Sequence, residues 1–218
     1  MARRAGKRAA RGGRPSRADA LRLREQILVA ATDLFLAEGY GSTTIEAVAA
    51  RAGVSKRTLY DRFDDKSVLF AAVVHRIIDA IRPAPEVPLI EGTSLPAILR
   101  RLAGFMLQAA LAPQAIALQR LVNAESARFP ELVRAVASDG STREGITLIG
   151  DLLARKLPRS KLSAEDRAFA AQQFIYMVVT LPQRRAMGFG TAMTPRELES
   201  WADRVVGLFL HGCRGLRE

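Results

Sequence analysis

The chain has 218 residues, of which 49% are hydrophobic with almost no strand-like alternation, and this favours an all-α protein of one small and one medium domain. Its single cysteine, Cys213, excludes an internal disulfide and is typical of a reducing cytoplasm. The longest apolar run, residues 174–179, is far shorter than the roughly 20 residues of a membrane-spanning helix, and the basic N-terminus lacks a signal peptide's apolar core. We therefore expect a cytoplasmic protein.

The net charge of +11 is concentrated at the N-terminus, where residues 1–17 carry +7 because they contain no acid. We interpret these residues as a basic disordered arm. Arg14, between Gly13 and Pro15, is similar to arginines that enter the narrow minor groove in DNA-binding proteins. The alternative is a solvated tail, which would still add counterion release and salt dependence to DNA binding.

A helix is predicted over residues 18–38, where the apolar stripe is formed by Leu23, Ile27, Ala31, Leu34 and Phe35. Glycines follow it and end it. Because this stripe must cover the apolar faces of the next two helices, we expect the helix to support them rather than to read bases.

Residues 43–63 predict two short helices joined at a glycine. Thr43 and Glu46 have the spacing of a capping box, so a helix is expected to begin there and to end at Gly53. Ser55 can cap a second helix over residues 55–63, whose Leu59 and Phe63 share a buried face. This pattern is typical of a helix-turn-helix, in which the second helix enters the major groove.

The run AGVSKRTLYDRFDDKSVLF, with Thr43-Thr44-Ile45 before it, resembles the DNA-binding domain of TetR-family transcriptional regulators over roughly residues 14–81. The glycine turn, Thr-Leu-Tyr, the phenylalanine and the lysine of DDKSVLF all stand at family spacing. Arg57 and Asp61-Arg62 depart from common family residues, and these departures leave the operator sequence open.

The candidate DNA contacts follow from chemistry and from this resemblance. Lys56, Arg57 and Thr58 lie in the first turn of the second helix, and Arg57 could pair bidentately with a guanine. The resemblance implies phosphate contacts from Tyr60, from Thr43 or Thr44, and from Lys66. The predicted set is Arg14, Thr43, Thr44, Ser55, Lys56, Arg57, Thr58, Tyr60 and Lys66. The alternative is that these are simply solvated polar positions.

A helix predicted over residues 65–82 is apolar enough to require cover from both halves of the chain. Prolines at 83, 85 and 88 end it. The expected domains are therefore the arm (1–17), a helix-turn-helix DNA-binding domain (18–82), a linker (83–93) and a helical ligand-binding and dimerisation domain (94–218).

Further helices are predicted over about 95–111, 113–128, 130–138, 142–157, 163–185 and 195–212, the last two opened by capping boxes. The segments Arg120-Leu121-Val122, Ala124-Glu125 and Arg128-Phe129-Pro130-Glu131-Leu132 resemble the C-terminal domain of the AefR-like branch of the family.

The last two long helices carry more apolar surface than one domain needs, which favours pairing with a second copy in a four-helix bundle. The resemblance implies the same, because family members dimerise this way. The predicted interface residues are Phe169, Gln173, Met177, Leu198, Trp201, Val205, Leu208 and Phe209.

An apolar ligand cavity is expected in the middle of the C-terminal domain. Its candidate lining is Leu102, Phe105, Met106, Leu121, Val122, Glu125, Phe174 and Tyr176, although each apolar member could equally be core packing. Glu125 shares a face with Leu118, Leu121 and Val122, so it either recognises a cation or pairs with an arginine such as Arg101 or Arg128.

The resemblance implies a homodimeric repressor that binds a palindromic operator on the bacterial nucleoid and is released by a small hydrophobic ligand. A DNA-organising protein of the same fold, without an inducer, is the alternative. An enzyme is disfavoured because the chain has two distant histidines, one cysteine, no nucleotide-binding loop and no metal-ligand spacing. We expect no cofactor and no metal.

Overall fold

The computed structural model describes residues 16–83, 89–92, 94–157 and 162–212, and within these ranges it contains ten helices and no strand. The helices are α1 Arg17–Glu38, α2 Ile45–Arg51, α3 Lys56–Tyr60, α4 Lys66–Ile81, α5 Leu95–Ala110, α6 Pro113–Glu125, α7 Glu131–Ser138, α8 Ser141–Lys156, α9 Ala164–Ala186 and α10 Pro195–His211. The prediction of an all-α fold is confirmed.

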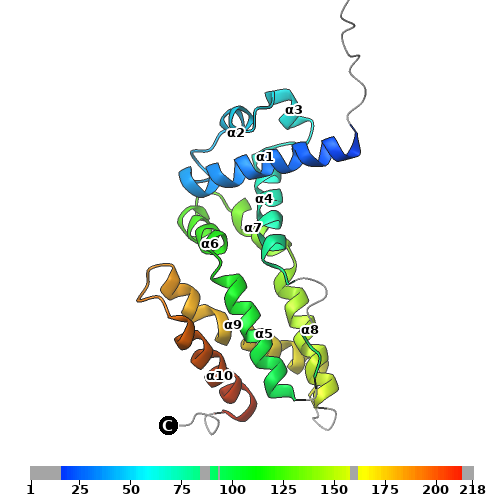
Figure 1. Cartoon of the computed structure of the whole chain (residues 1–218), viewed down its shortest axis with the longest axis vertical. Coiled ribbons are helices and arrows are strands. Elements are labelled where there is room, and N and C mark those ends of the chain that lie inside the picture. The colour runs from blue at the N-terminus through cyan, green and yellow to red at the C-terminus, as the bar shows by residue number, and fades with distance from the viewer. Residues whose placement is uncertain (1–15, 84–88, 93, 158–161, 213–218) are drawn as a thin grey trace, which may run out of the picture.

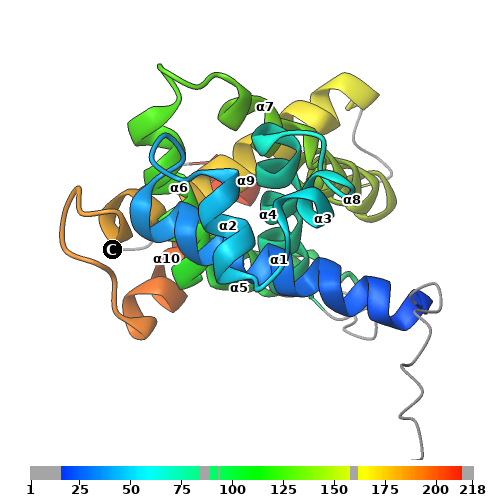
Figure 2. The same cartoon turned by 90° about the horizontal axis from the view of Figure 1, so that it is seen from above.

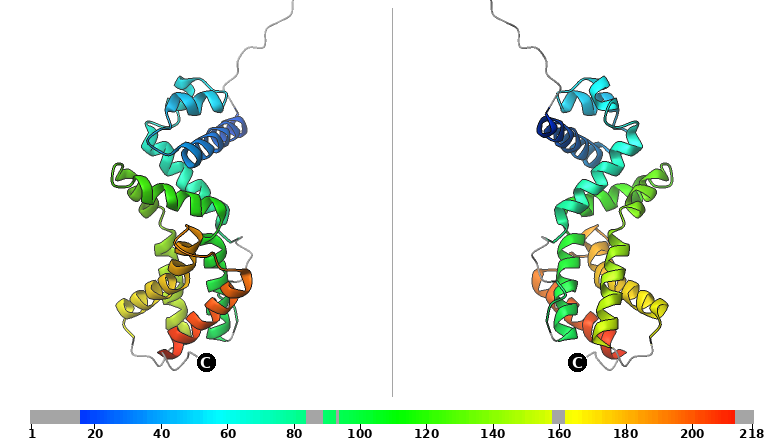
Figure 3. Two further views of the ribbon diagram at one scale, coloured as in Figure 1. Left: turned by 90° about the vertical axis from the view of Figure 1, so that its left-hand side faces the viewer. Right: turned by 90° about the vertical axis from the view of Figure 1, so that its right-hand side faces the viewer.

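The helices form an elongated molecule with two ends. Helices α1, α2 and α3 occupy one end, α5, α8, α9 and α10 occupy the other, and α6 and α7 lie between them (Figures 1 and 3). Figure 2 looks down onto the first end and shows α2 and α3 beside α1. Helix α4 leads away from this end toward the rest of the molecule.

A first hydrophobic cluster joins the four N-terminal helices to α6 and α7. At its centre Phe35, Tyr40 and Phe70 pack with ring centroids 5.3–5.6 Å apart, in stacked and edge-on arrangements. The cluster's buried members from α6 and α7 are Leu118, Leu121, Val122, Leu132 and Ala135. Helices α6 and α7 therefore share a core with the helix-turn-helix, although they follow it by many residues in the chain.

A second hydrophobic cluster joins α5, α8, α9 and α10. Phe174 of α9 is fully buried, and its ring lies 4.9 Å from that of Phe209 of α10. The indole Nε1 of Trp201 donates to the carbonyl oxygen of Val178 at 2.9 Å, which ties α10 to α9.

Helix α4 is covered from several sides, as its composition predicts. It packs against α1 in the N-terminal half and against α6 and α7 from the later part of the chain. Its face toward the first hydrophobic cluster contains Leu69, Phe70, Val73, Val74 and Ile77. The predicted domain boundaries remain a prediction, and part of the predicted linker lies outside the described residues.

Two helix ends near the turn differ from expectation. The residue that caps α2 is Thr44, whose side chain accepts from the amide of Ala47, because Thr43 is buried and donates its hydroxyl to the carbonyl oxygen of Gly39. Helix α3 ends at Tyr60 rather than at residue 63, and the chain continues as a turn that still buries Phe63.

Candidate nucleic-acid interface

The turn between α2 and α3 depends on a left-handed glycine. Gly53 has φ +64°, which lets the amide of Val54 turn back and donate to the carbonyl oxygen of Ala49 at 2.9 Å. At the other end of α2, the amide of Ala47 donates to the side-chain oxygen of Thr44 at 3.1 Å. Both ends of this seven-residue helix are therefore closed by local hydrogen bonds.

Ser55 begins α3 as a cap. Its hydroxyl oxygen accepts from the Thr58 amide at 3.1 Å and lies 2.8 Å from the Thr58 hydroxyl. Leu59 and Phe63 are buried beneath the helix, with 0% and 2% of their surface exposed. Burial of this side fixes the rotation of α3, so its basic first turn faces outward.

The outward face of α3 carries two cations and a phenol. Lys56 is paired with Glu46 of α2, and its Nζ lies 5.8 Å from the centroid of the Tyr60 ring. The hydrogen bond between Lys56 and Glu46 raises the pKa of the lysine and lowers the pKa of the glutamate. Arg57 is exposed and makes no ion pair with any residue that the structure describes, and Tyr60 is 42% exposed.

Two of the predicted DNA contacts are engaged inside the protein. Thr43 is only 1% exposed, so the exposed hydroxyl at this helix start is that of its neighbour Thr44. Lys66 Nζ donates to the carbonyl oxygens of Tyr40 at 2.7 Å and Thr43 at 3.0 Å, and burial lowers its pKa. In this structure Lys66 holds the loop between α1 and α2.

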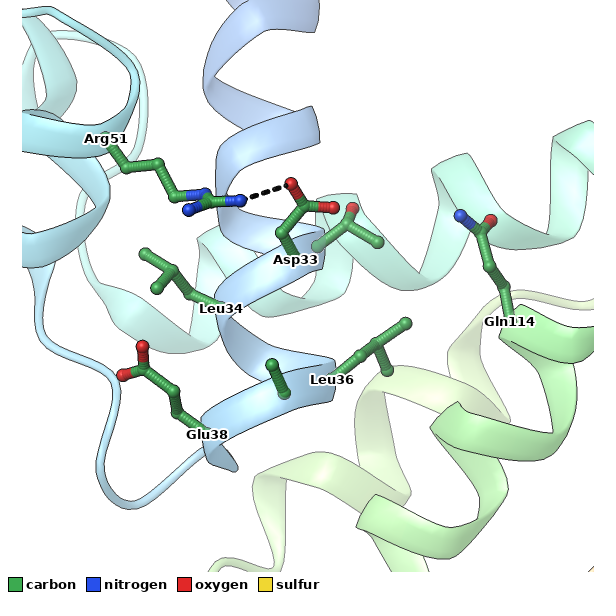
Figure 4. Close-up of a pocket in the computed structure, with 8 residues that line it drawn as sticks. Asp33, Leu34, Leu36, Glu38, Arg51 and Gln114 are labelled. Atoms are coloured by element: carbon green, nitrogen blue, oxygen red, sulfur yellow. Dashed lines mark hydrogen bonds and ion pairs between the residues drawn. The ribbon is translucent and has the colours of Figure 1, made fainter.

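Helix α1 supports the motif through contacts that sequence reasoning missed. Gln26 Nε2 donates to the carbonyl oxygen of Ala52 at 2.7 Å, at the C-terminal end of α2. Arg51 pairs with Asp33 at 3.0 Å, and this pair borders a surface hollow of about 430 Å³ between α1, α2 and α6 (Figure 4). These contacts join residues 18 to 26 positions apart, so no local pattern reveals them.

Five of the predicted DNA-binding residues are therefore exposed, on α3 or at the N-caps of α2 and α3, and one is half-buried. The exposed ones are Thr44, Ser55, Lys56, Arg57 and Tyr60, and the half-buried one is Thr58. Arg14 and the rest of the predicted arm up to residue 15 lie outside the described residues. A surface of hydroxyl, guanidinium, ammonium and phenol donors is suited to phosphate oxygens and base edges.

The predicted ligand-pocket residues do not surround a common cavity in the described structure. Leu121 and Val122 are in the first hydrophobic cluster, whereas Leu102, Met106 and Phe174 are in or against the second. Tyr176, also predicted for this pocket, is 49% exposed on α9, and Gln172 Nε2 donates to its hydroxyl at 3.2 Å. The reason is that α6 packs toward the helix-turn-helix instead of across the C-terminal helices.

Of that predicted set, Phe105 borders a smaller hollow of about 240 Å³ between the C-terminal ends of α4 and α5. Glu125 lies elsewhere, and its expected pairing with an arginine is wrong. Its two oxygens accept from the amides of Tyr40 and Gly41, while Arg101 donates to backbone carbonyls of Leu89 and Glu91.

The predicted interface residues divide between surface and core. Phe169 is 63% exposed, whereas Val205 is 4% exposed. The others are half-buried, namely Gln173, Met177, Leu198, Trp201, Leu208 and Phe209. Three of the exposed large apolar residues, Phe169, Tyr176 and Leu181, lie on α9.

The described residues contain no cluster of His, Cys, Asp or Glu side chains that could hold a metal ion. Within the same ranges no single helix is long and apolar enough to cross a membrane; α5 and α6 reach that length only as a pair, bent by 64°.

Two family matches cover the two halves of the chain. Residues 27–73 match the bacterial regulatory proteins of the tetR family, and residues 97–212 match the C-terminal domain of AefR-like transcriptional repressors. The chain belongs to the TetR family of transcriptional regulators. Regulators of this family bind DNA and form dimers.

Among curated proteins, the chain is similar to the transcriptional activator FasR of Mycolicibacterium smegmatis, with 43% identity over 56 residues, or 26% of each chain. It is 36% identical to the transcriptional repressor BepR of Brucella suis over 63 residues, covering 29% of this chain and 30% of BepR. The match to TcmR of Streptomyces glaucescens is longer, with 30% identity over 148 residues, covering 62% of this chain and 66% of TcmR. The chain thus spans less than two thirds of each of these relatives.

Solved structures match over almost the whole chain. A TetR-family regulator from Mesorhizobium loti has a TM-score of 0.72 and 30% identity, covering 89% of this chain and 97% of its own. The flavonoid-responsive regulator FrrA has a TM-score of 0.69 and 29% identity, and the match covers 87% of this chain and 95% of FrrA. The TetR arrangement therefore extends through both halves of the protein.

Proposed function

We propose that this protein is a homodimeric repressor that binds a palindromic operator through the first turn of α3. The observation that carries the proposal is the outward-facing set Ser55, Lys56 and Arg57, held in place by the buried Leu59 and Phe63. An unpaired arginine at a helix start can donate two hydrogen bonds to a guanine in the major groove. The protein would then act in the bacterial cytoplasm, on the nucleoid.

The proposed dimer is built on α9. Phe169 and Tyr176 are seven residues apart, so they lie on one face of the helix, and they are 63% and 49% exposed. Exposed aromatic side chains at this spacing favour a helical partner, and a second copy of the chain supplies an identical face. Two-fold symmetry would place two α3 helices about 34–36 Å apart, which matches one turn of DNA.

We infer that the effector is a small hydrophobic molecule that enters between α4 and α5. The hollow there is lined by Ala80, Ile81, Arg82, Pro83, Phe105, Gln108, Ala109 and Ala112. Its volume of about 240 Å³ is below that of most ligand sites, so binding would have to part the two helices. The flavonoid response of FrrA supports a ligand of this class. A tenfold loss of operator affinity needs only about 1.4 kcal/mol of differential binding.

The proposal is tested by footprinting the full chain on DNA upstream of its own gene, followed by in vitro transcription from the same fragment. We expect one or two protected palindromes and a reduced transcript. Dozens of dispersed sites would instead indicate a DNA-organising protein, and an increased transcript would indicate an activator, as FasR is named. Flavonoids and other small aromatic compounds should then be screened for release of the fragment.

A further inference from the structure

The loop that leads into the helix-turn-helix is held from the far side by an acid of α6. Glu125 Oε1 accepts from the amide of Tyr40 at 2.9 Å, and Glu125 Oε2 accepts from the amide of Gly41 at 2.7 Å. A carboxylate that accepts two backbone amides makes strong, charge-assisted hydrogen bonds with a fixed geometry. This contact spans 84–85 positions of sequence.

The same loop is held from the near side by Lys66 of α4. Its Nζ donates to the carbonyl oxygens of Tyr40 and Thr43 and lies 4.4 Å from the centroid of the Tyr40 ring. Thr44, which follows Thr43 in the chain, is the N-cap of α2. Little free chain therefore separates the Glu125 contact from the first DNA-binding helix.

The contact between Glu125 and the loop leaves little room for a side chain at two glycines. A Cβ on Gly39 would lie 2.6 Å from Glu125 Oε1, and a Cβ on Gly41 would lie 3.1 Å from both Glu125 Oε2 and the ring of Phe129. The Phe129 ring also packs edge-on against Tyr40, with centroids 5.0 Å apart. The C-terminal end of α6 and the loop are thus in close contact over several atoms.

Helix α6 also contacts α9, which carries the proposed dimer face. The Arg120 guanidinium donates to the carbonyl oxygen of Ala186 at 2.9 Å, and Asn123 Nδ2 approaches the sulfur of Met187 at 3.7 Å. One short helix is therefore bonded both to the end of α9 and to the loop before α2. Displacement of α6 by either neighbour would move the loop.

We propose that Glu125 is a positioning residue for DNA binding, which transmits the position of α6 to α2 through its hydrogen bonds to Tyr40 and Gly41. Operator affinity then depends on Glu125 although Glu125 touches no DNA. This inference rests on the proposed function for its DNA readout, but the hold on the loop can be measured without DNA.

The experiment compares the full chain with its Glu125→Gln and Glu125→Ala variants, with Glu199→Ala as a control on an exposed acid of α10. Hydrogen exchange reports the amides of residues 40–47. Fluorescence anisotropy reports the affinity for the footprinted operator and for a random-sequence duplex of the same length. Circular dichroism and light scattering verify that fold and oligomeric state are retained.

We expect both Glu125 variants to exchange faster at residues 40–47 and to bind the operator about tenfold more weakly, a typical size for coupling between sites. The direction of the change in operator affinity is diagnostic, because simple removal of an acid from a DNA-binding protein strengthens its attraction to DNA. Unchanged exchange at Tyr40 and Gly41, or operator affinity equal to or above that of the unmodified chain, would overturn the inference. If the unmodified chain prefers no upstream fragment, the proposed function fails, and the exchange data alone decide whether Glu125 holds the loop.

Discussion

Lys56 of α3 and Glu46 of α2 form an ion pair across the helix-turn-helix, on the face that we assign to DNA. The lysine must leave this partner to contact a phosphate, and the glutamate adds a negative charge beside the duplex. We therefore expect Glu46→Gln to strengthen DNA binding by a few-fold at low salt, with the gain fading as salt screens these exposed charges. Anisotropy titrations at several salt concentrations measure both effects. Weaker binding by this variant at every salt concentration would show that the pair orders the interface instead.

Arg57→Ala should remove sequence reading while leaving the fold intact, because the side chain is exposed and makes no ion pair among the described residues. Loss of a bidentate arginine costs about 1–3 kcal/mol of discrimination between bases. Competition between operator and random-sequence duplex measures that loss. Arg134→Ala, which removes an exposed arginine of α7, is the matched control and should retain the preference. An unchanged preference in Arg57→Ala would contradict the assignment of α3.

Phe169→Asp should yield monomers that remain folded, because this ring is 63% exposed in the single chain and contributes little to its core. Trp201 is a less informative target, since its indole is bonded to Val178 and its loss would also weaken α10 packing. Light scattering reports the mass, and circular dichroism reports the fold. Val133→Asp alters another exposed apolar residue, on α7, and should remain dimeric. If Phe169→Asp still forms dimers, the interface does not depend on this face of α9.

Gly39→Ala should destabilise the protein more than Gly53→Ala does. Both glycines have positive φ, where an alanine is strained, and Gly39, with ψ 161°, lies in a region that is populated essentially by glycine alone. At Gly53 the new Cβ meets nothing closer than 3.9 Å, whereas at Gly39 it would lie 2.6 Å from Glu125 Oε1. Urea unfolding of both variants measures the difference. Equal destabilisation of the two variants would mean that the Glu125 side chain moves aside without a measurable loss of stability.

Deletion of residues 2–15 should flatten the salt dependence of DNA binding, because this segment holds six basic residues and no acid, while Ser16 remains in place to cap α1. The slope of log K against log salt is the observable, and operator preference should fall less than it does in Arg57→Ala. An unaltered slope would show that the arm makes no contact with DNA.

Local signals in the sequence predict most helices within a few residues. The capping boxes at Ser163 and Thr194 are present in the structure and open α9 and α10 as expected. The same rule fails by one residue at α2, because two threonines are adjacent and the one with the right spacing to Glu46 is used inside the protein. Capping patterns cannot tell which of two neighbouring hydroxyls is buried.

The candidate site, too, is predicted from the sequence only in part. The outward face of α3 follows from periodicity, since Leu59 and Phe63 define its buried side. The sequence does not predict the partners of Glu125, because hydrogen bonds to backbone amides 84–85 positions away do not affect the pattern of side chains. The sequence also does not locate the predicted cavity. Helix α6 packs against α1 and α4, and the pattern of its apolar residues does not distinguish this packing from packing against the C-terminal helices.

Footprinting on the upstream DNA, with the full chain and Arg57→Ala side by side, tests most directly whether a symmetric pair of α3 helices reads a duplex. We predict one or two protected palindromes whose half-sites are about 10 base pairs apart, and no protection by the variant at the same concentration. Protection without two-fold symmetry that is equally strong in Arg57→Ala would contradict this mode of DNA binding.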